Sequence, residues 1–160
     1  MTAQQTIPAA PAGAAAGHPR RFLTFTARIL GNGRDSGGLH AVELQLPPGE
    51  RSPWHVHHDE DEWFYVIEGQ AEVLVGDART RLGGGDFAFG PRDVPHGFRI
   101  TSATPARLLL LTVGGRFSEF IAENSVPIVA GAAPDGDPDL AALAASARRY
   151  GQEILGPLPD

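Results

Sequence analysis

Short apolar segments, separated by turn residues, restrict the fold of this chain more than any other feature of its sequence. Within one of them, Val42 and Leu44 alternate with Glu43 and Gln45, which predicts one buried face and one wet face. The chain has 20 glycines and 14 prolines among its 160 residues, which favours turns over long helices. A spacing of about 8 to 12 residues between segments is typical of a β-sandwich or barrel. A single all-β domain is therefore predicted, with strands at 22–30, 39–46, 63–68, 70–76, 79–82, 86–89, 96–100 and 106–113.

The N-terminal region has a different composition from these segments. Residues 1–21 are rich in Ala, Pro and Gly, and they are predicted to form a flexible arm because they can bury little apolar surface. Arg20 and Arg21 precede apolar residues as in a twin-arginine export signal, but Arg28 interrupts that stretch, which also fits a first strand. The longest apolar run, 108–113, is too short to cross a bilayer. We therefore expect a cytoplasmic protein with no membrane partner.

The period of the apolar residues changes after residue 113. Phe117, Phe120 and Ile121 have helical spacing and predict a short helix or turn that caps the barrel. Farther along, Asp137 as N-cap and Pro138 at the first helical position predict a helix over 138–150. Residues 114–160 are expected to form a helical extension that packs on a barrel domain of residues 22–113.

The charged and reactive residues exclude several classes of function. All 13 basic residues are arginine, so there is no lysine for a Schiff base, for pyridoxal phosphate or for a phosphate-binding loop. The chain also contains no cysteine, which excludes disulfides and thiolate chemistry. A net charge of -6 argues against a nucleic-acid partner. Histidines and carboxylates remain as the groups for chemistry, and a small molecule is the expected partner.

Four of these groups have a spacing that suits a metal ion. On an extended chain His55 and His57 project from the same face, with Cα atoms about 6.6 Å apart, so that two imidazoles can converge on one ion. Glu62 and His96 each share the parity of apolar residues at the start of their own strands, and therefore point into the barrel. Nitrogen and oxygen ligands with two open positions suit a divalent Fe, Mn, Co, Ni or Zn ion and do not rank these metals.

These stretches resemble the two motifs of the cupin family, G-x5-H-x-H-x4-E-x6-G and G-x5-P-x-G-x2-H-x3-N. The first reads GERSPWHVHHDEDEWFYVIEG without departure, the second reads GDFAFGPRDVPHGFRI, and 15 residues lie between Gly69 and Gly85. The sequence departs from the second motif at Asp93, where the family usually has glycine, and at Ile100, where it often has asparagine. The resemblance implies a single cupin β-barrel, or jelly roll, over residues 22–113.

The resemblance also implies a function. WHVHHDEDEWFYVIEG, PRDVPHGFR and FSEFIAE are similar to the small single-domain cupins grouped with quercetin dioxygenase. In that group His55, His57, Glu62 and His96 would hold one divalent metal ion per subunit, and Glu62 would also act as the catalytic base. The expected function is a dioxygenase-type reaction of O2 with a small hydroxylated aromatic or enolisable compound.

Two other functions use the same residues. A non-oxidative isomerase or a polyketide-cyclase type of enzyme would use the metal as a Lewis acid without O2. A cupin that binds or stores a small molecule without catalysis is the third alternative. Oxygen uptake during turnover separates the dioxygenase from the non-oxidative enzyme. The fold alone does not choose among the three functions.

The pattern also predicts positions for the remaining polar and aromatic residues. His58 is expected to face solvent or an interface, while Asp59, Glu60 and Asp61 are expected at the solvated tip of a loop. His40 fits either a group near the metal or a hydrogen-bonded core histidine. Because aromatic residues are expected around the metal, the ligand should be apolar or aromatic. The expected lining of the substrate pocket is His40, Phe64, Phe87, Phe89 and Phe98.

Two segments are apolar on both faces. WFYVI at 63–67 and LLLL at 108–111 have no polar side to present to water, so a second layer must cover them. This pattern predicts a homodimer that buries the outer surface of these strands.

Overall fold

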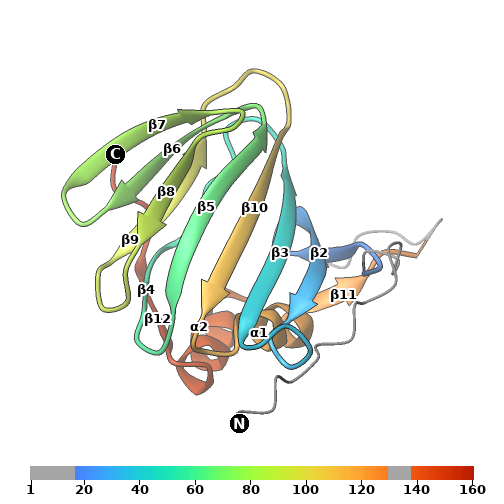
Figure 1. The fold of residues 1–160 in the computed structure, drawn as a ribbon. Helices are drawn as coiled ribbons and strands as arrows, with labels where there is room; N and C mark the ends of the chain where they lie inside the picture. The colour runs from blue at the N-terminus through green and yellow to red at the C-terminus, as the bar shows by residue number, and fades with distance from the viewer. Residues whose placement is uncertain (1–16, 130–137) are drawn as a thin grey trace, which may run out of the picture.

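Two antiparallel sheets face each other, and helices lie at one end of them (Figure 1). The structure is a computed structural model that describes residues 17–129 and 138–160. The seven strands of the larger sheet follow one another in space as β11 (Ser125–Pro127), β1 (Arg20–Phe22), β2 (Phe25–Asn32), β3 (Leu39–Leu46), β10 (Ala106–Val113), β5 (Asp61–Glu68) and β8 (Phe87–Gly90).

The smaller sheet closes the other side of the barrel. Its strands follow one another as β12 (Gln152–Gly156), β4 (Trp54–His57), β9 (His96–Ile100), β6 (Gln70–Val75) and β7 (Ala78–Gly83). Every strand pair in both sheets is antiparallel. The predicted all-β barrel with a C-terminal helical extension is confirmed.

The interior is built from alternate residues of each strand. On β10, Leu108 and Leu110 are buried, whereas Leu109 and Leu111 point to the outer face and are half-buried. The neighbouring strands follow the same alternation, and Leu110 pairs with Val42 on β3 and with Phe64 on β5. Because each apolar face points inward, one continuous core fills the space between the sheets.

The N-terminal end of the barrel differs from the prediction in one place. The segment expected as one strand over 22–30 is broken at Leu23, which adopts a left-handed φ of 53° and separates β1 from β2. Strand β1 begins at Arg20, inside the segment expected to be a flexible arm, and Arg20 donates hydrogen bonds to the hydroxyl and carbonyl oxygens of Ser125. Residues 1–16 of the expected arm lie outside the described residues.

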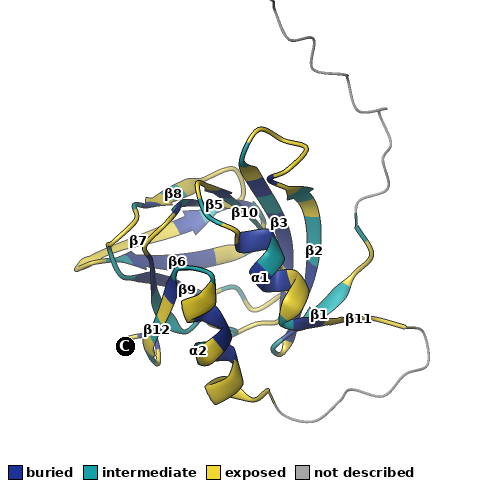
Figure 2. Ribbon diagram, turned by 90° about the horizontal axis from the view of Figure 1, so that it is seen from below, coloured by how far each residue is buried: buried dark blue, intermediate teal, exposed yellow. Residues whose placement is uncertain are grey.

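The C-terminal extension contains strands as well as helices. Helix α1 (Phe117–Glu123) and helix α2 (Leu140–Arg149) lie at the end of the barrel that faces the viewer in Figure 2. The helix predicted over 138–150 begins later, because the side chain of Asp139 accepts a hydrogen bond from the Ala142 amide and acts as the N-cap. The predicted N-cap, Asp137, lies outside the described residues. Strands β11 and β12, which were not predicted, join one sheet each.

The outer face of the larger sheet presents apolar side chains in register. Trp63 of β5 pairs with Phe89 of β8 and with Leu111 of β10, and the ring centroids of Trp63 and Phe89 are 4.7 Å apart. One step along, Tyr65 pairs with Phe87 and Leu109. We call these six residues the outer-face patch: Trp63, Tyr65, Phe87, Phe89, Leu109 and Leu111. In the part of the chain that the structure describes, no helix combines the length and the apolar character that crossing a membrane requires.

Candidate metal centre

Strand pairing places the three motif histidines side by side. His55 and His57 lie two residues apart on β4, so their side chains leave the same face of the strand. His55 pairs directly with His96 on β9. The three imidazole centroids lie 4.7 to 5.2 Å from one another. The strands thus turn residues separated by 41 positions in the sequence into one cluster, as the parity of the sequence predicted.

Glu62 approaches this cluster from the opposite sheet. It stands near the start of β5, and its Oε2 lies 3.1 Å from Nε2 of His96 and 3.5 Å from Nε2 of His57. The distance from the same oxygen to Nε2 of His55 is 3.8 Å. One ligand atom from each of the four side chains lies within 4.8 Å of the other three. Four atoms gathered so closely can bind a single ion.

Hydrogen bonds at Nδ1 of His55 and His96 orient the Nε2 atoms of these rings toward the cluster. The Nδ1 atoms of His55 and His96 lie 2.9 and 2.8 Å from the carbonyl oxygens of Pro53 and Val94. A carbonyl only accepts, so each Nδ1 carries the proton and each Nε2 has a free lone pair. Among the described residues, Nε2 of His57, Nε2 of His96 and Oε2 of Glu62 are buried and have no hydrogen-bond partner. This donor set fits a divalent metal ion.

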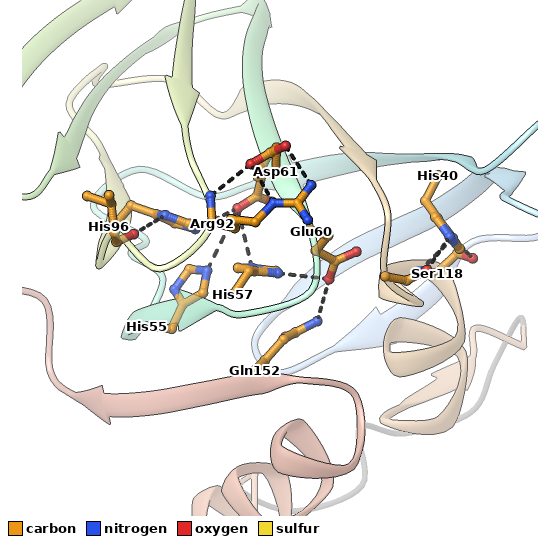
Figure 3. A network of polar contacts seen from close by, with 12 residues as sticks. His40, His55, His57, Glu60, Asp61, Arg92, His96, Ser118 and Gln152 are labelled. Carbon is orange, nitrogen blue, oxygen red and sulfur yellow. Dashed lines mark hydrogen bonds and ion pairs between the residues drawn. The ribbon is translucent and has the colours of Figure 1, made fainter.

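Glu60 completes the back of the site, and its predicted place at a solvated loop tip is wrong. It has no exposed surface, and its Oε1 accepts hydrogen bonds from Nδ1 of His57 at 2.8 Å and from Nε2 of Gln152 at 3.1 Å (Figure 3). The signal was present in the sequence, because Glu60 shares the parity of Glu62. Gln152 belongs to β12, and no spacing in the sequence linked it to the motifs.

Burial and charge set the protonation of the cluster. Burial lowers the pKa of His55, which favours the neutral ring that can bind a metal. Burial by itself raises the pKa of the Glu62 carboxyl, but the surrounding histidines outweigh it and hold that pKa below its usual range. Glu62 is therefore a carboxylate at neutral pH.

A pocket extends from this cluster toward the helical end of the barrel. His55 and Glu62 lie in its wall, and its other polar residues are Ser52 and Gln152. The apolar lining comes from the barrel and from the C-terminal extension: Phe22, Leu23, Phe25, Leu44, Pro53, Phe64, Phe98, Leu110, Phe117, Phe120, Ile121, Leu143 and Ile154. Phe117, Leu143 and Ile154 stand outside the motifs; the sequence predicted that their segment packs on the barrel, but it did not predict that these side chains line the pocket.

Two of the five residues expected in the pocket line it, namely Phe64 and Phe98. Phe87 and Phe89 do not, because β8 turns them to the outer face, where they are 65% and 44% exposed. Their strand parity places Ala88 and Gly90 inward instead. His40 is buried away from the lining, with its two ring nitrogens bonded to Ser118 and to the carbonyl of Gly115 (Figure 3). Of the two alternatives for His40, a group near the metal or a hydrogen-bonded core histidine, the second is therefore the one found.

The other motif residues occupy places with clear local causes. His58 and Asp59 are exposed, as expected, whereas Asp61 forms an ion pair with Arg92. Asp93 adopts a left-handed φ of 63°, a conformation that glycine adopts most easily. Ile100 is buried in the core and is not among the residues that line the pocket.

Comparison with known proteins agrees with the fold. The model of the cupin domain family matches residues 42–113. Quercetin 2,3-dioxygenase of Bacillus subtilis (strain 168) is 36% identical over 102 residues, which are 62% of this chain and 30% of that protein. The dimethylsulfoniopropionate lyase DddQ of Ruegeria pomeroyi is 36% identical over 97 residues, covering 59% of this chain and 46% of the lyase.

A solved structure extends the comparison to the fold. A variant oxalate decarboxylase of Bacillus subtilis has a TM-score of 0.56 and 28% identity, and the match covers 70% of this chain and 30% of that one. The chain thus spans less than half the length of the two curated relatives and of this structure. The relatives catalyse different reactions, so similarity alone does not select one.

Proposed function

The chain belongs to the cupin superfamily, and we propose that it is a metal-dependent enzyme of dioxygenase type acting on a small, uncharged hydroxylated aromatic or enolisable compound. One observation supports this function most strongly: Glu62 is part of the four-residue cluster and also part of the pocket wall. A single carboxylate can therefore reach both a metal ion and a substrate. We propose the cytoplasm as its compartment.

In this proposal His55, His57, Glu62 and His96 hold one divalent Fe, Mn, Ni, Co or Zn ion per subunit. The bound ion would supply Lewis acidity toward a substrate hydroxyl and toward O2. Glu62 accepts the proton of that hydroxyl on its carboxylate, as a general base. The apolar walls exclude water and hold the rest of the substrate. A dioxygenase places both atoms of O2 in the product, so the substrate itself supplies the electrons and no further reductant is needed.

The pocket wall limits the charge of the substrate. No arginine is among the described residues that line the pocket, and the sequence contains no lysine. The bound ion would be the only positive group that the described lining offers to an anionic substrate, and the rest of the substrate's hydration shell would be lost to apolar walls, which is costly. A neutral hydroxyl compound avoids this cost, because its proton passes to Glu62 only within the site. This wall favours a flavonol or a related neutral aromatic over a dicarboxylate such as oxalate.

We expect the metal-loaded protein to consume O2 when it receives such a compound. The measurement is O2 uptake with quercetin, with smaller enolisable aromatics and with oxalate, after loading with each of the five candidate metals in turn. The expected result is one O2 consumed per molecule of neutral substrate, both oxygen atoms in the product when 18O2 is used, and no turnover of oxalate.

The other outcomes identify the alternative functions. Conversion of the substrate without O2 uptake would replace the dioxygenase with a non-oxidative isomerase or cyclase. Tight binding of the compound with no conversion under any metal would indicate a small-molecule-binding cupin. The same assay with metal-free protein is the control, and it should show neither uptake nor conversion.

We also propose that the protein is a homodimer joined through the outer-face patch. Phe87, Phe89 and Tyr65 are exposed in a contiguous set of aromatic side chains, which is unusual for the surface of a monomer. Sedimentation equilibrium is expected to give a dimer at micromolar concentration. The double change Phe87→Glu and Phe89→Glu should weaken association by at least about thirtyfold, since loss of one interface hot spot costs about 2 kcal/mol. A parental protein that is monomeric at high micromolar concentration would contradict this assembly.

A further inference from the structure

Glu60 is a buried carboxylate that stands behind one candidate ligand. Its Oε1 lies 2.8 Å from Nδ1 of His57 and 3.1 Å from Nε2 of Gln152 (Figure 3). It does not line the pocket, so it has no access to a substrate there. A buried carboxylate is costly unless neighbouring groups offset its charge and its hydrogen-bonding needs. We therefore look for the role of Glu60 in its contact with His57 and in the charge that a bound ion would bring to the site.

The chain encloses Glu60 on the side away from His57. A side chain added at Gly115 would place its Cβ 2.8 Å from both Cδ and Oε2 of Glu60, so it would have to displace this carboxyl group. The Oε2 atom is buried and has no hydrogen-bond partner among the described residues. Gln152 holds Oε1 from β12. The carboxylate is therefore confined to an orientation in which it accepts the proton of His57.

His57 differs from the other two histidines in how its ring is held. The Nδ1 atoms of His55 and His96 face backbone carbonyls, which no substitution removes. The Nδ1 atom of His57 faces a side chain. A carboxylate only accepts, so Nδ1 of His57 carries the proton and Nε2 offers its lone pair to the cluster.

We propose that Glu60 is the positioning residue of the metal centre, which fixes the tautomer and orientation of His57 so that its Nε2 faces the other three ligand atoms. This inference rests on the proposed function, because that function needs an ion at His55, His57, Glu62 and His96. Glu60 also balances charge. Together with Glu62 it supplies two negative charges, which offset the two positive charges of a divalent ion in a buried site.

Two variants separate the hydrogen bond from the charge. Glu60→Ala removes the acceptor, whereas Glu60→Gln keeps a carbonyl oxygen for His57 and removes only the charge. Affinity for Zn2+ and Co2+ is measured by competition with a chelator. We expect Glu60→Ala to lower the affinity about tenfold to a hundredfold, the usual effect of losing a partner behind a metal-binding histidine. Glu60→Gln should recover part of that loss. Glu68→Ala, an exposed glutamate at the other end of β5, is the matched control and should match the parent.

A second readout reports on His57 itself. Long-range 1H-15N NMR of the imidazoles distinguishes a proton on Nδ1 from a proton on Nε2, and it needs no activity. Burial lowers the pKa of His57, but Glu60 and Glu62 outweigh it and raise that pKa, so the spectra are recorded at a pH above it. There the metal-free parent is expected to show His57 as the Nδ1–H tautomer, and Glu60→Ala should shift it toward a mixture of tautomers. The signals of His55 and His96 should stay unchanged, because their carbonyl partners remain. A merely structural role for Glu60 would alter the melting temperature without altering this pattern.

The outcomes separate this inference from the proposed function. Parental affinity together with an unchanged His57 tautomer in Glu60→Ala would overturn the role of Glu60. If Glu60→Ala fails to fold, the metal-free parent decides: a neutral His57 ring protonated on Nε2 in the parent would overturn the role of Glu60. If the parent binds neither ion, the proposed function fails, whatever the tautomer of His57.

Discussion

His57→Ala is expected to lose its metal on dialysis and its catalytic activity with it. A four-ligand structural zinc site gains about 10 to 16 kcal/mol from binding. Loss of one ligand in four should therefore cost about 2.5 to 4 kcal/mol, which lowers the affinity about 10²- to 10³-fold. The change also leaves Glu60 buried without its main partner, which should lower the free energy of unfolding as well. Metal content after dialysis and turnover of the identified substrate are the two measurements.

His58→Ala is the matched control for this experiment. His58 is the next residue in the chain, but it lies just beyond the end of β4, is exposed and contacts Asp93. The variant should keep the parental metal content and rate. A His57→Ala protein that retains a full equivalent of metal would show that the ion binds elsewhere.

Glu62→Gln is expected to separate catalysis from metal binding. Glutamine keeps the size of the side chain and a carbonyl oxygen for coordination, but it has no basicity. We expect the affinity for metal to stay within about tenfold to a hundredfold of the parent, a change of about 1.4 to 2.7 kcal/mol. Turnover should fall by about 10² or more, the usual effect of removing a general base. The rate is measured at saturating metal so that the two effects are distinguished.

The alternative bases near Glu62 are badly placed to rescue this variant. Asp59 is exposed, Asp61 pairs with Arg92, and Glu60 faces His57 outside the pocket lining. Glu68→Gln, at the exposed end of the same strand, should retain the parental rate. A Glu62→Gln protein with full metal and the parental rate would overturn the assignment of the base and favour Lewis-acid chemistry or simple binding.

Strand parity predicted the interior of the site well because it acts locally. The expected strands at 39–46, 96–100 and 106–113 have the same bounds in the structure. The inward positions of His55, His57, Glu62 and His96 followed from the same rule. The rule would also have turned Glu60 inward, whereas Phe89 faces outward because of the register in which β8 pairs with β5, which the sequence does not show. For Glu60, the run of acidic residues around it suggested a solvated loop tip. For Phe89, the expectation that aromatic residues line the pocket led to the wrong face.

The parts that the sequence did not predict depend on contacts between distant segments. Strand β12 pairs with β4, which lies far earlier in the chain, so nothing near Gln152 in the sequence signals its bond to Glu60. Helix α2 begins at Leu140 because the side chain of Asp139 caps it, although the sequence offered an N-cap two residues earlier. The left-handed turn at Leu23 splits a segment whose apolar pattern is continuous.

Anomalous diffraction from crystals of the cobalt-loaded protein tests the central claim most directly. The proposed site predicts one anomalous peak per subunit, about 2.0 to 2.2 Å from Nε2 of His55, His57 and His96 and from a carboxylate oxygen of Glu62. It also predicts no peak of comparable height at the exposed pair of His58 and Asp93. A principal peak at that surface pair, or no peak within the barrel at saturating cobalt, would contradict a metal centre built from these four residues.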